Sequence, residues 1–180
     1  EVADEFARGP EDNPEFGNAY CDWTTRQSIQ LHWIKLEDVP AIFEKLESVG
    51  LSTQQACGDS WRNIVGCPVA GKDTHEHIDA WPIAEDLHET FKGNDDYVNL
   101  PRKWKVSVTG CDEGCGQGDI NDLAYEPAEK EIETEDGSVE TRLGFNIRVG
   151  GGLSRKEPRM ARDLDVWVPP EQAADIGHGM

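Results

Sequence analysis

The chain has 180 residues, which is enough for one well-packed domain or two small lobes. It carries 36 acidic and 17 basic residues, and the net charge of -19 repels nucleic acid and anionic lipid, so neither is an expected partner. The sequence shows no apolar run long enough to span a bilayer and no basic, apolar leader, which argues against a membrane anchor or secretion and favours a cytoplasmic location.

The acidic residues are spread along the chain rather than gathered in one tail. Two interpretations of this excess are open. One is a solvated, halophile-like surface adapted to high salt, where screening makes self-repulsion cheap, and the other is an acidic docking face for a basic partner. The even spread favours the first. Against this background, a concentration of Arg and Lys on one face needs a reason.

The first residues predict a lead-in followed by a strand. Residues 1–20 are polar and rich in Glu, Asp, Gly and Pro, which predicts a mobile lead-in or a segment that packs on parts of the protein outside this sequence. In residues 23–34 apolar and polar side chains alternate, which is the period of a strand with one apolar and one polar face. The polar face is expected to carry Thr24, Arg26, Ser28, Gln30 and His32.

A helix is predicted after this strand. Asp38 is a suitable N-cap, Pro40 is tolerated in the first turn, and Gly50 can end the helix. The β-rich residues 51–58 read as a further strand. Strand, helix and strand together predict a split βαβ, ferredoxin-like half-domain over residues 21–56.

Residues 57–168 carry the pattern of a second, larger domain. A loop punctuated by Gly and Pro covers residues 60–72, and a helix is predicted within residues 74–92. Residues 169–180 are expected to begin a following segment, and we read both ends of the sequence as cuts through a longer protein. The other expected elements are strands at 100–109, 120–127, 143–149 and 166–168, an acidic hairpin or loop at 129–141, a glycine turn at 150–154 and a short helix near 158–164.

Two of these strands carry cationic residues on their polar faces. Arg26 lies in the middle of the first strand, and Lys103 and Lys105 are two apart, so they point the same way. Two ammonium groups side by side are mildly costly unless an anion lies between them. Periodicity alone leaves two alternatives open, a solvated face and an anion site, and it slightly favours the solvated face.

Two loops carry weaker signals. Arg62 lies on a loop just ahead of a Gly- and Pro-rich segment, and a single Arg there is usually a surface residue. The glycines at 150–152 can let a backbone approach a ligand closely. A plain glycine turn is the more economical reading, because the P-loop and dinucleotide fingerprints are absent from the sequence.

Five cysteines is an odd number, and without a secretory signal a disulfide framework is not expected. Cys111 and Cys115 have the spacing C-x3-C on a glycine-rich turn, and Cys57 and Cys67 lie on an earlier loop. Such loops can hold a metal or a cluster, but C-x9-C does not fit a zinc ribbon, so structural thiols are favoured. A solvent face rather than a metal site is expected for His75, His77 and His88.

Taken together, five ordered segments resemble the sulfite/nitrite reductase family of sirohaem and 4Fe–4S enzymes. Their order and spacing are similar to the first half of the internal repeat of the ferredoxin-dependent type, over about residues 20–168. The resemblance implies an α+β fold, with a ferredoxin-like half-lobe (21–56) followed by a sirohaem- and substrate-binding α+β lobe (57–168) whose sheet is mixed and largely antiparallel. The segments are TTRQSIQLHWI (24–34), ACGDSWRNIVGCPVAG (56–71), LPRKWKV (100–106), INDLAY (120–125) and GFNIRVGGGLS (144–154).

The resemblance also implies an activity and partners. The family reduces sulfite to sulfide or nitrite to ammonia by six electrons at sirohaem, with electrons arriving through a 4Fe–4S cluster and, in this type, from ferredoxin. The cluster cysteines are expected in the missing second half of the same enzyme. The chain is then a fragment of an oxidoreductase, and the fragment alone is expected to be inactive.

Residue roles are carried over from the matching segments. By resemblance, the anion-binding catalytic residues are Arg62, Lys103 and Lys105. The resemblance implies sirohaem-side contacts for Thr24, Arg26, Gln30 and His32. The same cofactor is expected to lie against Asn121, Gly150, Gly151 and Gly152.

The departures from the family pattern limit this assignment. A further substrate Arg of the family would precede residue 1, and Trp61 stands where a cysteine partner of Cys67 would be. No metal ligand is therefore assigned in this chain. A nonstandard second cluster stays a minor alternative, with Cys57, Cys67, Cys111 and Cys115 as its ligands.

The choice of substrate is divided. The Lys-x-Lys pattern at 103–105 resembles sulfite reductases, whereas INDLAY resembles nitrite reductases, and the balance slightly favours sulfite. Two other classes compete with the enzyme: a cofactor-free acidic binding or scaffold domain that kept the fold, and an acidic interaction module with no site. The retention of four cations in so acidic a chain argues against the last, namely Arg26, Arg62, Lys103 and Lys105.

Overall fold

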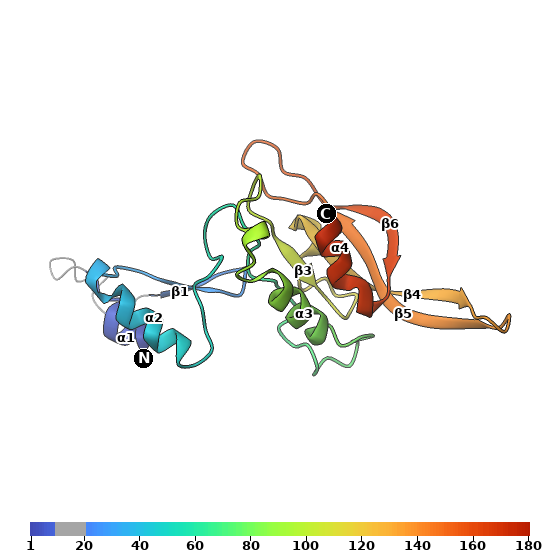
Figure 1. Cartoon of the computed structure of the whole chain (residues 1–180), viewed down its shortest axis with the longest axis horizontal. Coiled ribbons are helices and arrows are strands. Elements are labelled where there is room, and N and C mark those ends of the chain that lie inside the picture. The colour runs from blue at the N-terminus through green and yellow to red at the C-terminus, as the bar shows by residue number, and fades with distance from the viewer. Residues whose placement is uncertain (10–20) are drawn as a thin grey trace. The chain divides into compact units, whose positions relative to one another are not determined.

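The computed structural model describes residues 1–9 and 21–180, and these form two compact units, Glu1–Ala56 and Cys57–Met180 (Figure 1). Residues 10–20, the second half of the predicted lead-in, lie outside the described residues. Among the described helices, none is both long and apolar enough to cross a membrane.

The first unit contains a β-hairpin and two helices. The helix predicted after Asp38 is confirmed, although it ends three residues before Gly50. Its Lys45 forms an ion pair with Glu5 and lies over the ring of Phe6, which joins the two helices. The elements are α1 (Val2–Phe6), β1 (Cys21–Trp23), antiparallel β2 (Ile29–Leu31), a 3-10 turn (Leu36–Asp38) and α2 (Val39–Glu47).

The single strand predicted over 23–34 is wrong, because a turn interrupts it. Thr24 Oγ1 accepts the backbone N–H groups of Arg26 and Ser28 at 3.3 and 3.2 Å, and Gln27 adopts a φ of +53°. Such local side-chain bonds offer the backbone an alternative to an extended ladder. Arg26 therefore lies in a tight turn rather than in the middle of a strand.

The strand predicted at 51–58 is also wrong. These residues form bends and turns, and positive φ angles of +55° at Gln55 and +87° at Gly58 are incompatible with an extended strand. β-propensity reflects packing against neighbouring strands, so a β-rich composition predicts a strand only where such a neighbour exists.

The second unit is built on a four-stranded sheet in the order β3-β4-β5-β6. Only the β3–β4 pair is parallel, so the mixed, largely antiparallel sheet that we expected is confirmed. The acidic hairpin alternative for 129–141 is confirmed as well, because β4 and β5 pair along their whole length. The strands are β3 (Val106–Val108), β4 (Leu123–Glu133), β5 (Val139–Val149) and β6 (Arg162–Val168).

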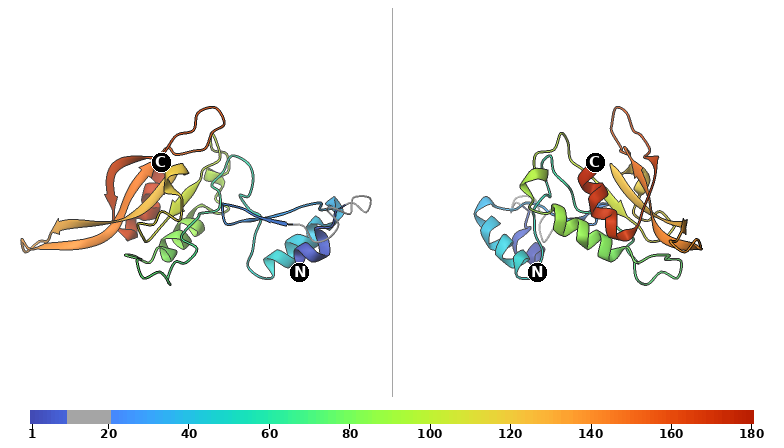
Figure 2. Two further views of the ribbon diagram at one scale, coloured as in Figure 1. Left: turned by 180° about the vertical axis from the view of Figure 1, so that it is seen from behind. Right: turned by 45° about the vertical axis from the view of Figure 1, so that its right-hand side comes forward.

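Two helices, α3 (Trp81–Phe91) and α4 (Ala173–Gly179), lie side by side over one face of this sheet (Figure 2). In the core, Phe91 of α3 stacks on Trp61, with ring centroids 3.7 Å apart. The hydroxyl of Tyr125 in β4 donates to Ala173 O at 2.8 Å and ties α4 to the sheet.

Of the two further helices predicted in this unit, one is wrong and the other is confirmed. The short helix near 158–164 is wrong, because the chain there enters β6, which pairs with β5. That pairing is non-local, and the local sequence does not reveal it. The helix predicted within 74–92 starts only at Trp81, with Pro82 in its first turn, so His75 and His77 lie in the preceding loop.

Phe91→Ala tests this core. The ring is 1% exposed and also meets Tyr97 edge-on at 4.7 Å, so its removal should lower the free energy of unfolding by about 3–5 kcal/mol. Urea unfolding followed by circular dichroism measures the change. Val139→Ala, at a side chain that is 64% exposed, is the control and should cost less than about 1 kcal/mol. Equal losses in the two variants would contradict the placement of Phe91.

Candidate functional site

A loop of the second unit runs parallel to the segment that enters β3. Trp61 pairs with Trp104, and Val65 pairs with Ser107, as isolated parallel bridges. Backbone hydrogen bonds accompany both bridges, including one of 3.1 Å from Val65 N to Val106 O. Residues 60–65, which we expected to be an irregular loop, therefore extend the edge of the sheet beside β3.

This pairing places predicted cations on one face. Arg62 N donates to Trp104 O at 2.8 Å, so residue 62 is the next position after the Trp61–Trp104 bridge and faces residue 105 if that register continues; the register shifts by one residue before the Val65–Ser107 bridge. Paired positions of parallel strands point their side chains to the same side, and both Trp61 and Trp104 pack at the core. Arg62 and Lys105 therefore share the opposite face. Alternation along the chain puts the exposed Lys103 on that face as well.

Backbone carbonyls hold the two partly buried cationic groups. Lys105 Nζ donates to Ile120 O at 2.7 Å, and an Arg62 guanidinium nitrogen donates to Gly58 O at 2.5 Å. These bonds fix the positions of both charged groups.

Asp122 fixes the backbone of Lys105. Its carboxylate accepts the Lys105 N–H at 2.8 Å, and Lys105 O accepts the backbone N–H groups of Asp122 and Leu123 at 3.0 and 3.1 Å. Our sequence reasoning did not single out Asp122. It lies inside the INDLAY segment, but no local pattern shows that its carboxylate reaches a strand 17 residues earlier.

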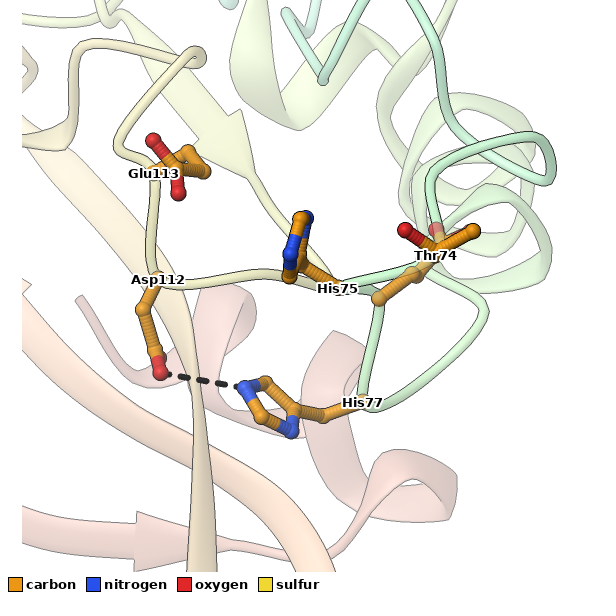
Figure 3. Close-up of a pocket in the computed structure, with 6 residues that line it drawn as sticks. Thr74, His75, His77, Asp112 and Glu113 are labelled. Carbon is orange, nitrogen blue, oxygen red and sulfur yellow. Dashed lines mark hydrogen bonds and ion pairs between the residues drawn. The ribbon is translucent and has the colours of Figure 1, made fainter.

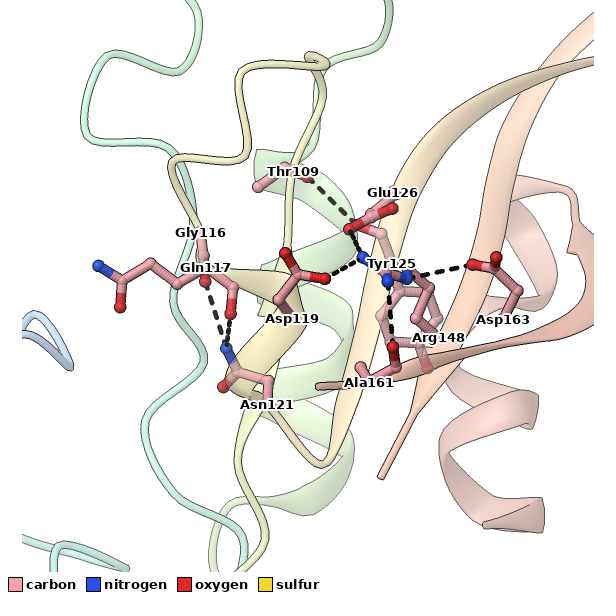
Figure 4. Close-up of polar contacts among 10 residues, drawn as sticks. All are labelled: Thr109, Gly116, Gln117, Asp119, Asn121, Tyr125, Glu126, Arg148, Ala161 and Asp163. Atoms are coloured by element: carbon pink, nitrogen blue, oxygen red, sulfur yellow. Dashed lines mark hydrogen bonds and ion pairs between the residues drawn. The ribbon is translucent and has the colours of Figure 1, made fainter. Parts of the chain in front are cut away.

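Asn121 is 2% exposed and ties together the loops around Lys105 (Figure 4). Its amide donates to Gln117 O at 2.7 Å and to Gly116 O at 3.3 Å. Its backbone carbonyl accepts Gly151 N at 2.9 Å. The side chain of Asn121 thus holds residues 116 and 117, and its backbone carbonyl holds the predicted glycine turn next to the segment that enters β4.

The glycine turn needs its glycines for different reasons. A Cβ on Gly151 would lie 2.3 Å from Asp119 O, so only glycine fits there. A Cβ on Gly152 would meet only Lys105 Nζ, at 4.0 Å, so this glycine keeps space open beside the ammonium group. The structure thus brings most predicted residues of the second unit together in what we call the cationic corner: Arg62, Lys103, Lys105, Asn121 and Gly150–Gly152.

Arg148 of β5 is a further residue that the sequence did not reveal. It bonds the carboxylates of Asp119, Glu126 and Asp163, the last two at 3.3 and 3.1 Å, and Ala161 O at 3.0 Å (Figure 4). Burial disfavours its charge, but the hydrogen bond to Asp119 and the charge of Glu126 outweigh this, so the pKa of Arg148 is raised. Arg148 thereby anchors the turn that leads into Asn121.

A cleft of about 510 Å³ opens beside the glycine turn. Two arginines lie on its wall, Arg159 and Arg162, and neither was predicted, because this segment was read as a helix. Gly152 pairs with Arg159 through backbone bonds of 2.8 and 2.9 Å, which holds the wall in place.

The sirohaem-side residues predicted in the first unit lie on its hairpin. Thr24 and Arg26 belong to the turn, and Gln30 is an exposed residue of β2. His32 lies just after β2, where its Nε2 is 2.9 Å from Asp22 Oδ2. Their cofactor role stays a prediction.

Three of the four cysteines of the minor cluster alternative lie close together in the second unit. Cys67 interacts with both Cys111 and Cys115, whereas Cys57 is exposed and lies outside this group. Burial raises the pKa of the Cys67 and Cys111 thiols, so both are neutral near pH 7 without a cation. Cys67 and Cys111 form, with Asp73, a group whose ligand atoms are close enough together to hold a metal ion.

Two family models match the chain. The nitrite and sulphite reductase 4Fe-4S domain matches residues 57–179, and the nitrite/sulfite reductase ferredoxin-like half domain matches residues 14–49. These matches agree with the two units, and the half-domain model agrees with the ferredoxin-like half-lobe that we expected.

Curated relatives and a solved structure agree with the models. An assimilatory ferredoxin-dependent nitrite reductase of Haloferax mediterranei is 56% identical over 97% of this chain and 29% of its own length. Sulfite reductase (ferredoxin) 1 of Mycolicibacterium paratuberculosis is 40% identical over 90% of this chain and 27% of its own. The structure of the Mycobacterium tuberculosis NirA protein matches with a TM-score of 0.73 at 33% identity, over 87% of this chain and 27% of that chain. The chain therefore spans less than a third of these relatives.

Gly151→Ala and Gly152→Ala separate the two roles of the glycine turn. Gly151→Ala should lower the free energy of unfolding by about 1–3 kcal/mol, because the added methyl overlaps a backbone carbonyl. Gly152→Ala should change it by less than about 0.5 kcal/mol. Thermal and urea unfolding of both variants provide the measurement, and a neutral Gly151→Ala would contradict the close approach described here.

Proposed function

The chain belongs to the nitrite and sulfite reductase family, and on this premise we propose that it is a segment of a ferredoxin-dependent assimilatory enzyme that reduces nitrite at sirohaem. The observation that carries the proposal is the pairing of residues 60–65 with the entry to β3, which places Arg62 and Lys105 on one face. In a chain with a net charge of -19, two fixed cations on one face favour an anionic ligand.

The cationic corner fits a macrocycle that carries carboxylates. Arg62 and Lys105 supply donors that pair with carboxylate oxygens, and Gly152 leaves room for a ligand to approach the Lys105 ammonium. We infer that these residues, with Asn121 behind them, form part of the sirohaem seat. Thr24, Arg26, Gln30 and His32 of the first unit are proposed as further sirohaem contacts.

The chemistry divides between the cofactors and the chain. When bound, sirohaem supplies the iron at which the anion is reduced, and the 4Fe–4S cluster, proposed to lie in the remainder of the enzyme, supplies electrons. The chain's own part is electrostatic: Arg62, Lys103 and Lys105 attract the oxyanion and stabilise its negative charge. The lysine ammonium groups also hold protons that can be delivered to oxygen as each N–O bond breaks.

The proposal commits to nitrite because the chain is 56% identical to a nitrite reductase and 40% identical to a sulfite reductase. Sulfite stays the second candidate, since a specific observation favours it. The Lys-x-Lys pattern that suggested sulfite places Lys103 and Lys105 on one side of the chain, which suits an anion with more oxygens. Ferredoxin is the proposed electron donor, and the remainder of the enzyme is needed to complete the seat and permit turnover.

Lys105→Asn in the full-length enzyme tests which anion the corner serves. Loss of the ammonium charge should lower kcat/KM for sulfite more than for nitrite, moving their ratio towards nitrite by about tenfold, or about 1.4 kcal/mol. Steady-state kinetics with both anions and reduced ferredoxin measure the ratio. Lys130→Asn, at an exposed position of β4, is the control and should leave it unchanged. An unchanged ratio in Lys105→Asn would contradict a selecting role for Lys105.

A further inference from the structure

Two loops of the second unit bring thiols and a carboxylate, none of them part of the cationic corner, to one point. Cys67 and Asp73 lie at the ends of one loop, and Cys111 lies on the glycine-rich turn after β3. One ligand atom from each of the three residues lies within 4.8 Å of the other two. Cys111 is buried, and the other two are partly buried, so a cation here would be largely shielded from water.

A fourth donor stands beside these three. Cys115 is exposed and interacts with the side chain of Cys67. Its sulfur is not in the group whose ligand atoms lie within 4.8 Å of one another, so it would have to move closer to become the fourth ligand of a tetrahedral ion. We propose that Cys67, Asp73, Cys111 and Cys115 form a mononuclear zinc site that clamps the two loops together, a function separate from the proposed reduction.

The donor set and its spacing favour a single zinc ion. Zinc takes thiolate and carboxylate ligands in a tetrahedron, and zinc–sulfur bonds of about 2.3 Å put two ligand sulfurs about 3.8 Å apart. Atoms within 4.8 Å of one another reach that spacing with small side-chain rotations. A cubane cluster binds each thiolate through a different iron, which spreads the thiolates further apart.

The two loops are fixed by their own backbone contacts, so the ligands are in position before a metal arrives. His77 N donates to Gly110 O at 2.7 Å, which joins the loop after Asp73 to the residue before Cys111. A Cβ on Gly110 would lie 1.9 Å from Ile78 O, so the two backbones touch and only glycine fits. Asp73 N donates to Val69 O at 3.1 Å and closes the first loop.

Neighbouring groups orient the carboxylate as a zinc site requires. Asp73 Oδ1 accepts the backbone N–H of His75 at 2.9 Å and lies 3.2 Å from the His75 ring. Ligating carboxylates are held by such second bonds, which leave the other oxygen for the metal. A cavity of about 370 Å³ lies next to this segment in sequence, since His75, Asp112 and Glu113 are among its lining residues (Figure 3).

The clamp would stabilise the segments that carry the cations. The first loop follows directly from residues 60–65, and Cys111 follows directly from β3. An ion that joins the two loops therefore holds the far end of the parallel pair on which Arg62 and Lys105 depend. Its predicted effect is on folding stability, because the four ligands lie on the two loops and are not themselves residues of the cationic corner.

Metal analysis of the full-length enzyme tests the proposal. Purified wild-type protein should hold about one zinc ion per chain, because four donors complete a structural zinc site. Elemental (inductively coupled plasma) mass spectrometry measures the zinc content. Cys67→Ser and Cys111→Ser should lose most of this zinc with iron unchanged. Cys57→Ser is the matched control, since Cys57 is exposed and outside the group, and it should keep its zinc.

Cys115→Ser separates loss of a zinc ligand from misfolding. Its side chain is exposed, so the variant should fold like the wild type. Titration of the zinc-stripped protein with Cd²⁺, followed by thiolate absorption, should show an affinity at least about tenfold weaker than in the wild type. The proposal is overturned by zinc-free wild-type protein, by loss of iron rather than zinc in Cys111→Ser, by a disulfide between Cys67 and Cys111 in the purified enzyme, or by unchanged cadmium affinity in Cys115→Ser.

Discussion

The parallel pairing of residues 60–65 with the entry to β3 is the constraint on which the second unit depends. On one side it sends Trp61 into the core, where the indole stacks on Phe91. On the other side it places Arg62 and Lys105. Burial of Trp61 thus fixes where the charged side chains point, because a shift of the segment's register by one residue would exchange its two faces.

Much of this architecture could be predicted from sequence where the signal is local. α2 and α3 were found from helical periodicity and punctuation, and the β4–β5 hairpin from an acidic turn between alternating strands. Errors arose where distant partners decide the structure. The strand predicted at 166–168 is confirmed as the end of β6, but its first residues were read as the end of a helix because the pairing with β5 is non-local. At Thr24 a local hydroxyl bond outweighed the alternation that predicted one strand.

The candidate site divides in the same way. Residue type and family resemblance identified Arg62, Lys105 and Asn121, but not how they are held. Two supporting interactions join segments that are distant in the sequence. They are the hydrogen bond from the Lys105 N–H to the Asp122 carboxylate and the ion pair between Arg148 and Asp119. The cysteines show the same limit. Their spacing excluded a zinc ribbon, whereas folding groups Cys67 with Cys111 and Asp73 and leaves Cys57 aside.

The central claim is that Arg62 and Lys105 act on one common anion, and a double-mutant cycle in the full-length enzyme tests it most directly. The cycle compares kcat/KM for nitrite among the wild type, Arg62→Gln, Lys105→Gln and the double variant. Two charges on one ligand should show a coupling energy of at least about 1 kcal/mol. Strictly additive losses, with coupling below about 0.3 kcal/mol, would contradict the claim.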